Sequence, residues 1–264
     1  MIFVLSLAGC SDVIDVDLET APPKLVVDAS IDWLKGTNGN VQKIRLSTTT
    51  GYYSNEFPTV SGATIFVTNS SNKVFNFREG EKHGEYICTD FLPVIGNTYS
   101  LTVIVGSETY TAVETLIGSP SIDSTFTQNN EGGMMGDEKE IEYSFQDDGS
   151  QQNYYMTRVE RTRIAFPQFS LESDEDYQGK KITQYYSHAD HKAGDVLGIT
   201  LYGVSKTFFD YFGKILIASG NDDSPFPATP TIVKGNIVNK TREGNYALGY
   251  FRLSEVSTRS YTFE

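Results

Sequence analysis

Histidine is scarce in this chain, with three in 264 residues, and the motifs of common hydrolases are absent. There is no Gly-x-Ser-x-Gly elbow, no His-Glu-x-x-His pair and no phosphate-binding loop. The 34 acidic residues make carboxylate pairs unavoidable, so such a pair does not by itself identify a glycosidase. The sequence therefore presents no catalytic constellation, and we expect neither an enzyme nor a resident cofactor.

Long apolar runs and basic residues are also few. No apolar run approaches the roughly 18 residues that a membrane-spanning helix needs. The 21 basic and 34 acidic residues give a net charge of −13, which repels a nucleic-acid backbone, so we expect no nucleic-acid partner. Aromatic residues are plentiful at 12% and apolar residues reach 39%, which is enough to build the cores of two domains.

Cysteine occurs only twice, at Cys10 and Cys88. A disulfide between the two is one interpretation. However, Leu7-Ala8-Gly9-Cys10 resembles a bacterial lipobox, in which the cysteine carries acyl chains and the preceding residues are removed. Two or three acyl chains hold a protein stably in a membrane. We therefore expect a lipid anchor on Cys10 and an unpaired, buried Cys88.

Residues 1–22 are predicted to be a lipoprotein signal followed by an acidic tether. A complete signal peptide usually begins with Lys or Arg residues, but none precedes Cys10. We therefore expect the natural start to lie further upstream. Behind the cysteine, Asp12, Asp15 and Asp17 resemble the acidic signal that exports lipoproteins of Bacteroidota to the cell surface. These features predict an outer-membrane protein held by its N-terminal lipid and facing the cell exterior. An anchor facing the periplasm is the alternative.

Residues 23–118 contain seven short runs with β-strand character, separated by turns at regular spacing. Apolar and small polar residues alternate over 99–105, and Gly106-Ser107 is a hairpin signal. Seven strands at this spacing predict an immunoglobulin-like β-sandwich. The predicted strands are 24–31, 41–47, 63–68, 73–77, 85–88, 99–105 and 108–116.

Residues 119–264 are predicted to form a second antiparallel β domain, either a sandwich or a barrel-like fold, which carries one helix. Ser119-Pro120-Ser121-Ile122-Asp123 marks the boundary before it. The polar segments 128–138 and 172–179 are expected to be loops. The predicted strands are 140–146, 153–166, 181–187, 196–203, 231–238, 246–256 and 261–263.

The predicted helix covers residues 205–219. Ser205 suits the N-cap position. Phe208, Phe212 and Ile215 recur at a spacing that places them on one helix face. We expect this face to pack on a sheet; insertion into lipid or against a ligand is the alternative.

Metal-ligating residue types cluster in His188-Ala189-Asp190-His191. A zinc site needs three or four converging ligands, so Asp195 or His83 would have to join the cluster through folding. The alternative is a solvated loop. Two acidic runs, Asp174-Glu175-Asp176 and Asn221-Asp222-Asp223, carry the oxygen ligands that calcium prefers, although neither has the spacing of an EF-hand loop.

Two tyrosine pairs are the candidate ligand-binding residues. Tyr154 and Tyr155 lie in one predicted strand, and Tyr185 and Tyr186 lie in another. Exposed aromatic rings provide stacking surfaces for a glycan or a peptide. If the four rings converge in an open groove, a binding role gains support.

The mature chain resembles a family of Bacteroidota surface lipoproteins whose genes commonly lie beside TonB-dependent outer-membrane receptors. The resemblance rests on several segments in order, none of which is a catalytic motif. They are the lipobox with 15–18, Leu25–Ile31, Glu85-Tyr86, Gly96–Leu101, Pro120–Asp123, Val204–Phe212, Pro225-Phe226, Pro230, Gly235–Ile237 and Ala247–Phe251. In such a protein, Asp123-Ser124-Thr125 also resembles the short O-glycosylation acceptor that Bacteroidota use, with Ser124 as the modified residue.

The resemblance implies an accessory lipoprotein whose partner is a TonB-dependent outer-membrane receptor in nutrient uptake. It assigns no functional residue. The alternatives are a stand-alone glycan- or peptide-binding protein, or an adhesin-like surface protein, and a hydrolase that uses the histidine cluster or a carboxylate pair.

Overall fold

The computed structural model describes residues 21–264 except 52–53, 55, 163 and 221–231. Cys10, its tether and the candidate calcium ligands at 221–223 therefore lie outside the described residues. The described part of the chain is nearly all β and carries one helix, as the sequence predicts. None of its helices is long and apolar enough to cross a membrane.

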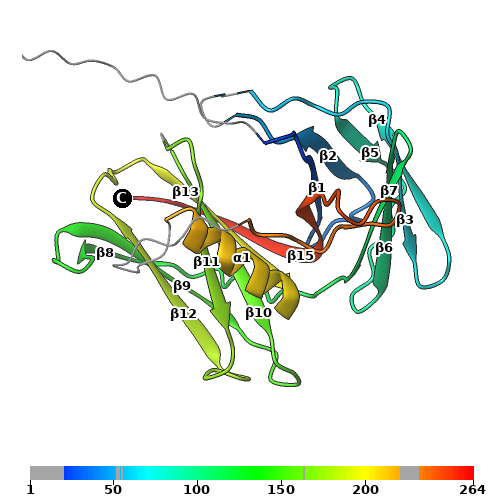
Figure 1. The fold of residues 1–264 in the computed structure, drawn as a ribbon. Coiled ribbons are helices and arrows are strands. Elements are labelled where there is room, and N and C mark those ends of the chain that lie inside the picture. Colours follow the sequence, from blue (N-terminus) through cyan, green and yellow to red (C-terminus); the bar gives the residue numbers. More distant parts are fainter. Residues whose placement is uncertain (1–20, 52–53, 55, 163, 221–231) are drawn as a thin grey trace, which may run out of the picture.

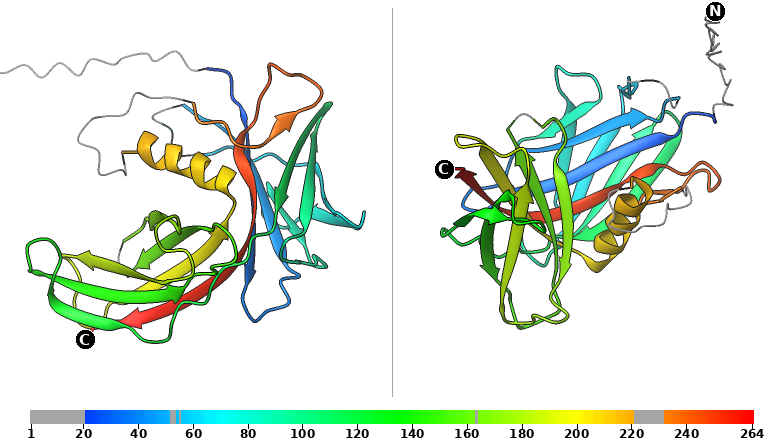
Figure 2. Two further views of the ribbon diagram at one scale, coloured as in Figure 1. Left: turned by 90° about the horizontal axis from the view of Figure 1, so that it is seen from below. Right: turned by 90° about the vertical axis from the view of Figure 1, so that its left-hand side faces the viewer.

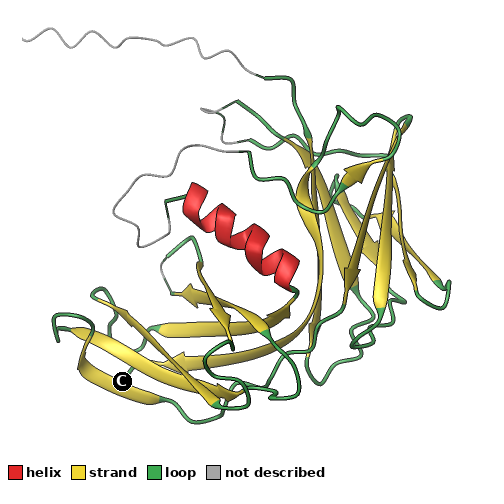
Figure 3. Cartoon of the chain, turned by 60° about the horizontal axis from the view of Figure 1, so that its bottom comes forward, coloured by secondary structure: helices red, strands yellow, loops and turns green. Residues whose placement is uncertain are grey.

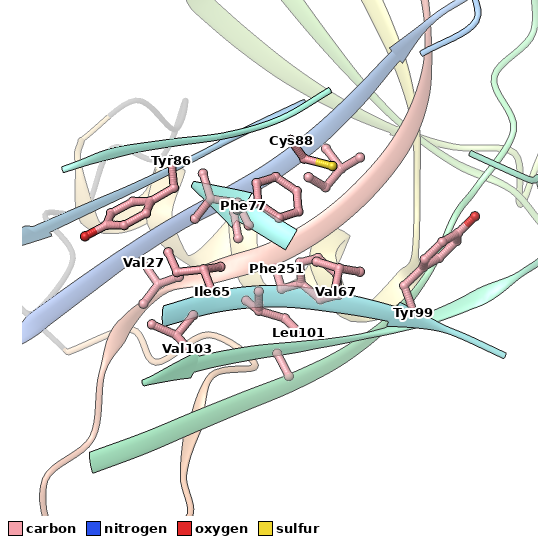
Figure 4. Close-up of a cluster of buried hydrophobic side chains, with 14 of the residues drawn as sticks. Val27, Ile65, Val67, Phe77, Tyr86, Cys88, Tyr99, Leu101, Val103 and Phe251 are labelled. Carbon is pink, nitrogen blue, oxygen red and sulfur yellow. The ribbon is translucent and has the colours of Figure 1, made fainter. Parts of the chain in front are cut away.

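The first sandwich has the immunoglobulin-like architecture predicted for the N-terminal half (Figure 1). Its strands are β1 (Leu25–Leu34), β2 (Gln42–Thr48), β3 (Thr64–Asn69), β4 (Val74–Glu79), β5 (Glu85–Cys88), β6 (Thr98–Val105) and β7 (Glu108–Thr115). β1, β2 and β5 lie in one layer and β3, β6 and β7 in the other, and β4 pairs with both β3 and β5. Alternate side chains point between the layers, where Val27, Phe77, Tyr86 and Leu101 are buried (Figure 4).

The second sandwich packs a three-stranded sheet on part of a larger one. The small sheet contains β8 (Thr127–Gly132), β9 (Glu138–Gln146) and β12 (Lys181–His188). The facing layer contains β10 (Tyr154–Arg161), β11 (Gln168–Ser173), β13 (Val196–Val204) and the end of β15 (Leu248–Thr262). The core between the layers includes Phe145, Tyr155, Ile182 and Leu197.

Strand β15 belongs to both sandwiches (Figure 1). Its first part, from Leu248 to Val256, pairs in parallel with β1, and its second part, from Val256 to Thr262, pairs antiparallel with β13. The first core consequently contains Phe251 and Leu253 beside residues of 27–116. The expected division at residue 118 therefore does not separate the two cores along the chain, since a strand from the C-terminal end completes the first sandwich.

The two sandwiches meet where the chain crosses from one to the other. Ile117 bridges to β15, donating its N–H to Leu253 and accepting from the N–H of Glu255. Just after it, the carbonyl oxygen of Gly118 lies so close to Gly203 of β13 that a Cβ there would be 1.9 Å away. A glycine is thus required at this crossing for steric reasons.

Helix α1 (Lys206–Ala218) covers the outer face of the second sandwich, in the angle between the two sandwiches (Figures 2 and 3). Ser205 is its N-cap and accepts the N–H of Phe208 at 3.2 Å, as predicted. Phe208 packs with Met156, Tyr202 and Val204, so the aromatic face does lie on a sheet.

Some segments differ from the sequence-based expectation. The polar loop expected at 128–138 contains β8, an edge strand with a register shift, which needs no alternation of apolar residues. The strand expected over 153–166 ends at Arg161, and β11 returns beside β10 after Pro167, which cannot donate to a ladder. In 232–239, only β14 (Val238–Asn239) is a strand, and the separate runs expected near the C-terminus form the single β15.

Candidate functional site

A cleft of about 480 Å³ lies between the two sandwiches. The outer face of β1 forms one side, and α1 with β10 and β11 forms the other. β15 lines the base, because it is the strand that continues from one sandwich into the other. Clefts at domain junctions with a volume of several hundred Å³ are typical ligand sites.

Aromatic rings on α1 and its neighbours make up one wall of the cleft. Tyr211 of α1 packs on Tyr250 of β15 with 4.8 Å between ring centroids, and Phe208 meets Tyr250 edge to face at 5.1 Å. Further out, Phe212 meets Phe169 of β11 edge to face at 5.3 Å. Tyr211, Phe212 and Phe169 are only partly buried, so their rings remain available to a ligand.

Arg252 provides a fixed positive charge at the base of the cleft. Its Nη2 lies 2.8 Å from Oδ1 of Asp32 on β1, and its Nη1 donates to Oγ of Ser254 at 2.7 Å. The guanidinium also lies over the rings of Tyr202 and Phe208, at 4.9 and 5.3 Å from their centroids. A planar guanidinium held by an ion pair and two rings is well suited to bind a carboxylate or phosphate with little rearrangement.

Two further ion pairs lie at the rim. Arg45 of β2 lies 3.4 Å from Asp28 of β1, and both side chains are half exposed. On the opposite side, Arg158 of β10 pairs with Glu160 at 2.5 Å. Three arginines and two aspartates thus line the cleft of a chain whose net charge is −13. The site therefore favours ligands that combine an anionic group with an apolar or ring-shaped part.

Sequence reasoning missed the charged base of this cleft. Asp28, Ser30 and Asp32 alternate with buried Val27 and Ala29, and such alternation indicates only a face turned away from the core. Nothing in the sequence indicates that β15 lies beside β1, and that pairing is what brings Arg252 to Asp32.

The four candidate tyrosines do not converge in a groove. Tyr155 and Tyr186 are buried in the second core, because each faces inward from its strand. Tyr154, on the opposite face of β10, packs on Phe209 of α1 at 5.1 Å between ring centroids. Only Tyr185 is well exposed, at 62%, and it stands alone on the edge strand β12. The four tyrosines therefore share no common platform. Two rings of the cleft, Phe208 and Phe212, belong to the helix face for which ligand contact was the alternative expectation, whereas Tyr211, Tyr250 and Phe169 were not among the candidates.

The histidine cluster is brought together without forming a metal site. Asp190 donates its N–H to Nδ1 of His188 at 3.1 Å, and its Oδ2 lies 3.7 Å from the same nitrogen. His191 instead stacks on Phe263 at 4.2 Å between ring centroids, and burial together with His188 lowers its pKa. Within the described residues, no three or more His, Cys, Asp or Glu side chains are arranged to hold a metal ion. His188, Asp190 and His191 line a small pocket of about 260 Å³.

The remaining candidates are single residues. Ser124 is exposed just after the crossing between the sandwiches, so a glycosylating enzyme has access to it. Cys88 is a free cysteine, 1% exposed in the first core, and burial raises the pKa of its thiol to about 11. The expected burial of Cys88 is confirmed, while the other cysteine, Cys10, lies outside the described residues.

Fold and cleft together define a class: a two-sandwich β protein with a ligand-sized cleft at the junction, closed on one side by a helix. The chain belongs to the family described as "Domain of unknown function (DUF4249)", whose model matches residues 11–260. No curated protein matches the chain.

The chain is also similar, at low sequence identity, to parts of solved structures. A two-domain fibronectin type III segment of chicken tenascin is 13% identical, with 69% of this chain and 90% of the segment covered, at a TM-score of 0.23. A chain of a cytokine receptor complex is 6% identical, with 70% of this chain and 86% of that chain covered, at a TM-score of 0.28.

Proposed function

We propose that this protein is a lipid-anchored outer-membrane protein, facing the cell exterior, that captures a ligand in the interdomain cleft for a TonB-dependent receptor. The observation that carries the proposal is the pairing of a fixed guanidinium, Arg252, with the partly buried rings of Tyr211 and Phe212 in one cleft. A preformed polar anchor beside an apolar wall is the usual composition of a small-molecule site.

The chemistry of the cleft supports binding rather than catalysis. Among its described lining residues there is no histidine, cysteine or lysine to move a proton near neutral pH. Its carboxylates, Asp28 and Asp32, are both engaged by arginines. The lining therefore recognises a ligand by charge and by ring contact.

The membrane part of the proposal is supported by the sequence. The lipobox at Cys10 and the acidic residues after it agree with an exported lipoprotein. The family resemblance suggests the receptor as partner. A stand-alone binder of a glycan or a peptide is the second candidate, since the same rings would stack on a sugar or an aromatic side chain without any transporter.

Affinity purification of the lipidated protein from gently solubilised outer membranes tests the partner. We expect a TonB-dependent receptor in stoichiometric amount, both with and without crosslinking. If no transporter is recovered under either condition, the receptor part of the proposal is wrong and the stand-alone binder takes its place.

The cleft is tested separately by analysing small molecules released when the purified protein is denatured, followed by glycan and peptide arrays. Tyr211→Ala removes a ring of the cleft wall and is expected to lower ligand affinity by about 2- to 10-fold. Lys214→Ala is the matched control, because Lys214 lies on the same helix but does not line the cleft. Equal binding by both variants would place the ligand elsewhere.

A further inference from the structure

Two turns that carry carboxylates meet at one end of the second sandwich. Asp147 follows β9, and Asp174 follows β11. The N–H of Asp174 donates to the carbonyl of Asn153 at 3.2 Å, which continues the pairing of β10 with β11 by one residue. Because side chains alternate along a strand, Asp174 lies on the same face as Glu172 and its partner Tyr155, the face turned toward β9.

Asp147 is buried with both of its oxygens in use. Asp147 is 4% exposed. Oδ1 accepts the hydroxyl of Tyr155 at 2.5 Å, and Oδ2 accepts the N–H of Gly179 at 2.7 Å. A carboxylate has about four acceptor positions, so Asp147 retains two for a further ligand.

Asp174, in contrast to Asp147, is a buried acid whose carboxylate oxygens are not hydrogen-bonded. It is completely buried, at 0% exposed, and neither Oδ1 nor Oδ2 has a hydrogen-bond partner. Neither Asp174 nor Asp147 forms an ion pair with a Lys, Arg or His of the described chain. A buried carboxylate without a partner is costly, and proteins normally avoid the cost by protonation or by placing a cation against it.

Acidic residues outnumber basic residues on the two turns. Asp148, Glu175 and Asp176 are exposed on the same two turns, and Lys180, also exposed, is the basic residue there. The turns are in contact, since a Cβ on Gly149 would lie 2.7 Å from Cα of Gly179. Burial and the neighbouring Asp147 raise the pKa of Asp174.

We propose that Asp174 and Asp147 are the carboxylate ligands of a hard divalent cation, with Ca²⁺ as the best match. The donors offered by these turns are oxygens, and the turns contain no histidine or cysteine that would favour zinc. Main-chain oxygens and water complete such a coordination shell. A cation at this place neutralises both carboxylates and clamps the turn after β9 to the turn after β11. The site is separate from the interdomain cleft and does not depend on the function proposed for it.

Calorimetric titration and thermal unfolding of the purified full chain, first stripped with EDTA, test the site with CaCl₂ as the probe and MgCl₂ in parallel. We expect Ca²⁺ to raise the unfolding temperature saturably, and Mg²⁺ to do so less. Asp174→Asn is expected to lower Ca²⁺ affinity by more than about tenfold, since it removes one of two buried carboxylates. Glu175→Gln is the control, because Glu175 is exposed on the same turn.

A second measurement needs no variant of the carboxylates. Tb³⁺ replaces Ca²⁺ and emits when a nearby tyrosine is excited, and Tyr155 is in contact with Asp147. We expect Tb³⁺ emission that Ca²⁺ displaces and that Tyr155→Phe reduces severalfold. A Ca²⁺-independent unfolding temperature without displaceable Tb³⁺ emission would overturn the proposal. So would a gain in stability of Asp174→Asn in EDTA with no Ca²⁺ response of the wild type, because Asp174 would then be a buried neutral acid.

Discussion

Arg252 and Asp32 form an ion pair of 2.8 Å across two neighbouring parallel strands, although 220 residues separate them in the sequence. Arg252 is almost fully buried, whereas the side chain of Asp32 is 42% exposed. The pair exists only because β15 returns beside β1 before continuing into the second sandwich. The base of the cleft and the connection between the sandwiches are thus made by the same strand.

The unequal burial of this pair predicts unequal effects of removing its members. Asp32→Ala leaves the buried guanidinium without a counter-charge, and we expect a loss of about 1–3 kcal/mol in the free energy of unfolding. Arg252→Met leaves a carboxylate that water can reach, so the expected loss is smaller. Urea unfolding of both variants and of the double variant measures the difference and the coupling between the residues.

Asp28→Ala is the matched control for that experiment. Asp28 lies on the same face of β1, but its ion pair with Arg45 is half exposed on both sides. Solvent screening limits such a pair to less than about 1 kcal/mol. If Asp28→Ala lowers the free energy of unfolding as much as Asp32→Ala does, the burial of Arg252 does not explain the contribution of the Arg252–Asp32 pair to stability.

The close crossing at Gly203 yields a second prediction. A methyl group there would lie 1.9 Å from the carbonyl oxygen of Gly118, and both partners are backbone, so neither side chain can move aside. We expect Gly203→Ala to lower the free energy of unfolding by more than about 2 kcal/mol. Gly198→Ala in the same strand meets its nearest atom, Cβ of Glu160, at 3.7 Å and should be close to neutral. Thermal unfolding of the two variants compares them directly.

Local patterns in the sequence predict most of the strands and the helix. The alternation of apolar residues over β6 and the N-cap of α1 are patterns of neighbouring residues. Both elements can therefore be placed from the local sequence alone. The edge strand β8 escapes this reasoning, because a solvent-facing Gln and Asn run carries no apolar period. Likewise, the sequence does not distinguish the single strand β15 from the two shorter strands predicted at 246–256 and 261–263, because the residues alternate in the same way in both cases.

The cleft is not predictable in the same way, because it is made by long-range pairing. The parallel register of Asp32 with Ser254, and of Ser30 with Arg252, depends on contacts between the two ends of the chain. The four candidate tyrosines are two pairs of residues that are adjacent in the sequence. Adjacent residues in a strand point to opposite faces, so Tyr155 and Tyr186 were bound to enter the core once Tyr154 and Tyr185 faced outward.

Acid is expected to destabilise the first sandwich through Glu79. Its carboxylate accepts the N–H groups of Gly84 at 3.0 Å and Gly62 at 2.9 Å, and these hydrogen bonds lower its pKa from 4.5 to about 2. A lowered folded-state pKa means that the stabilisation is complete above the unfolded pKa and is lost as the pH falls from about 4.5 to about 2.

Urea midpoints between pH 6 and pH 2 measure this loss, and Glu79→Gln should flatten the fall in that range. Glu81→Gln is the control, because Glu81 is exposed on the adjoining turn. An unchanged acid profile in Glu79→Gln would assign the pH dependence to other carboxylates.

Cys88 predicts how the first core opens. Its side chain is 1% exposed, its Sγ donates to Oδ1 of Asp90 at 3.2 Å, and burial raises the pKa of its thiol to about 11. Because the thiolate is the reactive form, the native protein should react with a disulfide reagent at neutral pH far more slowly than the urea-unfolded chain. The reaction should accelerate only at urea concentrations that unfold the first sandwich, since β5 lies inside its sheet. Rapid labelling of the folded protein would instead mean that β5 separates from its neighbours while the rest of the chain stays folded.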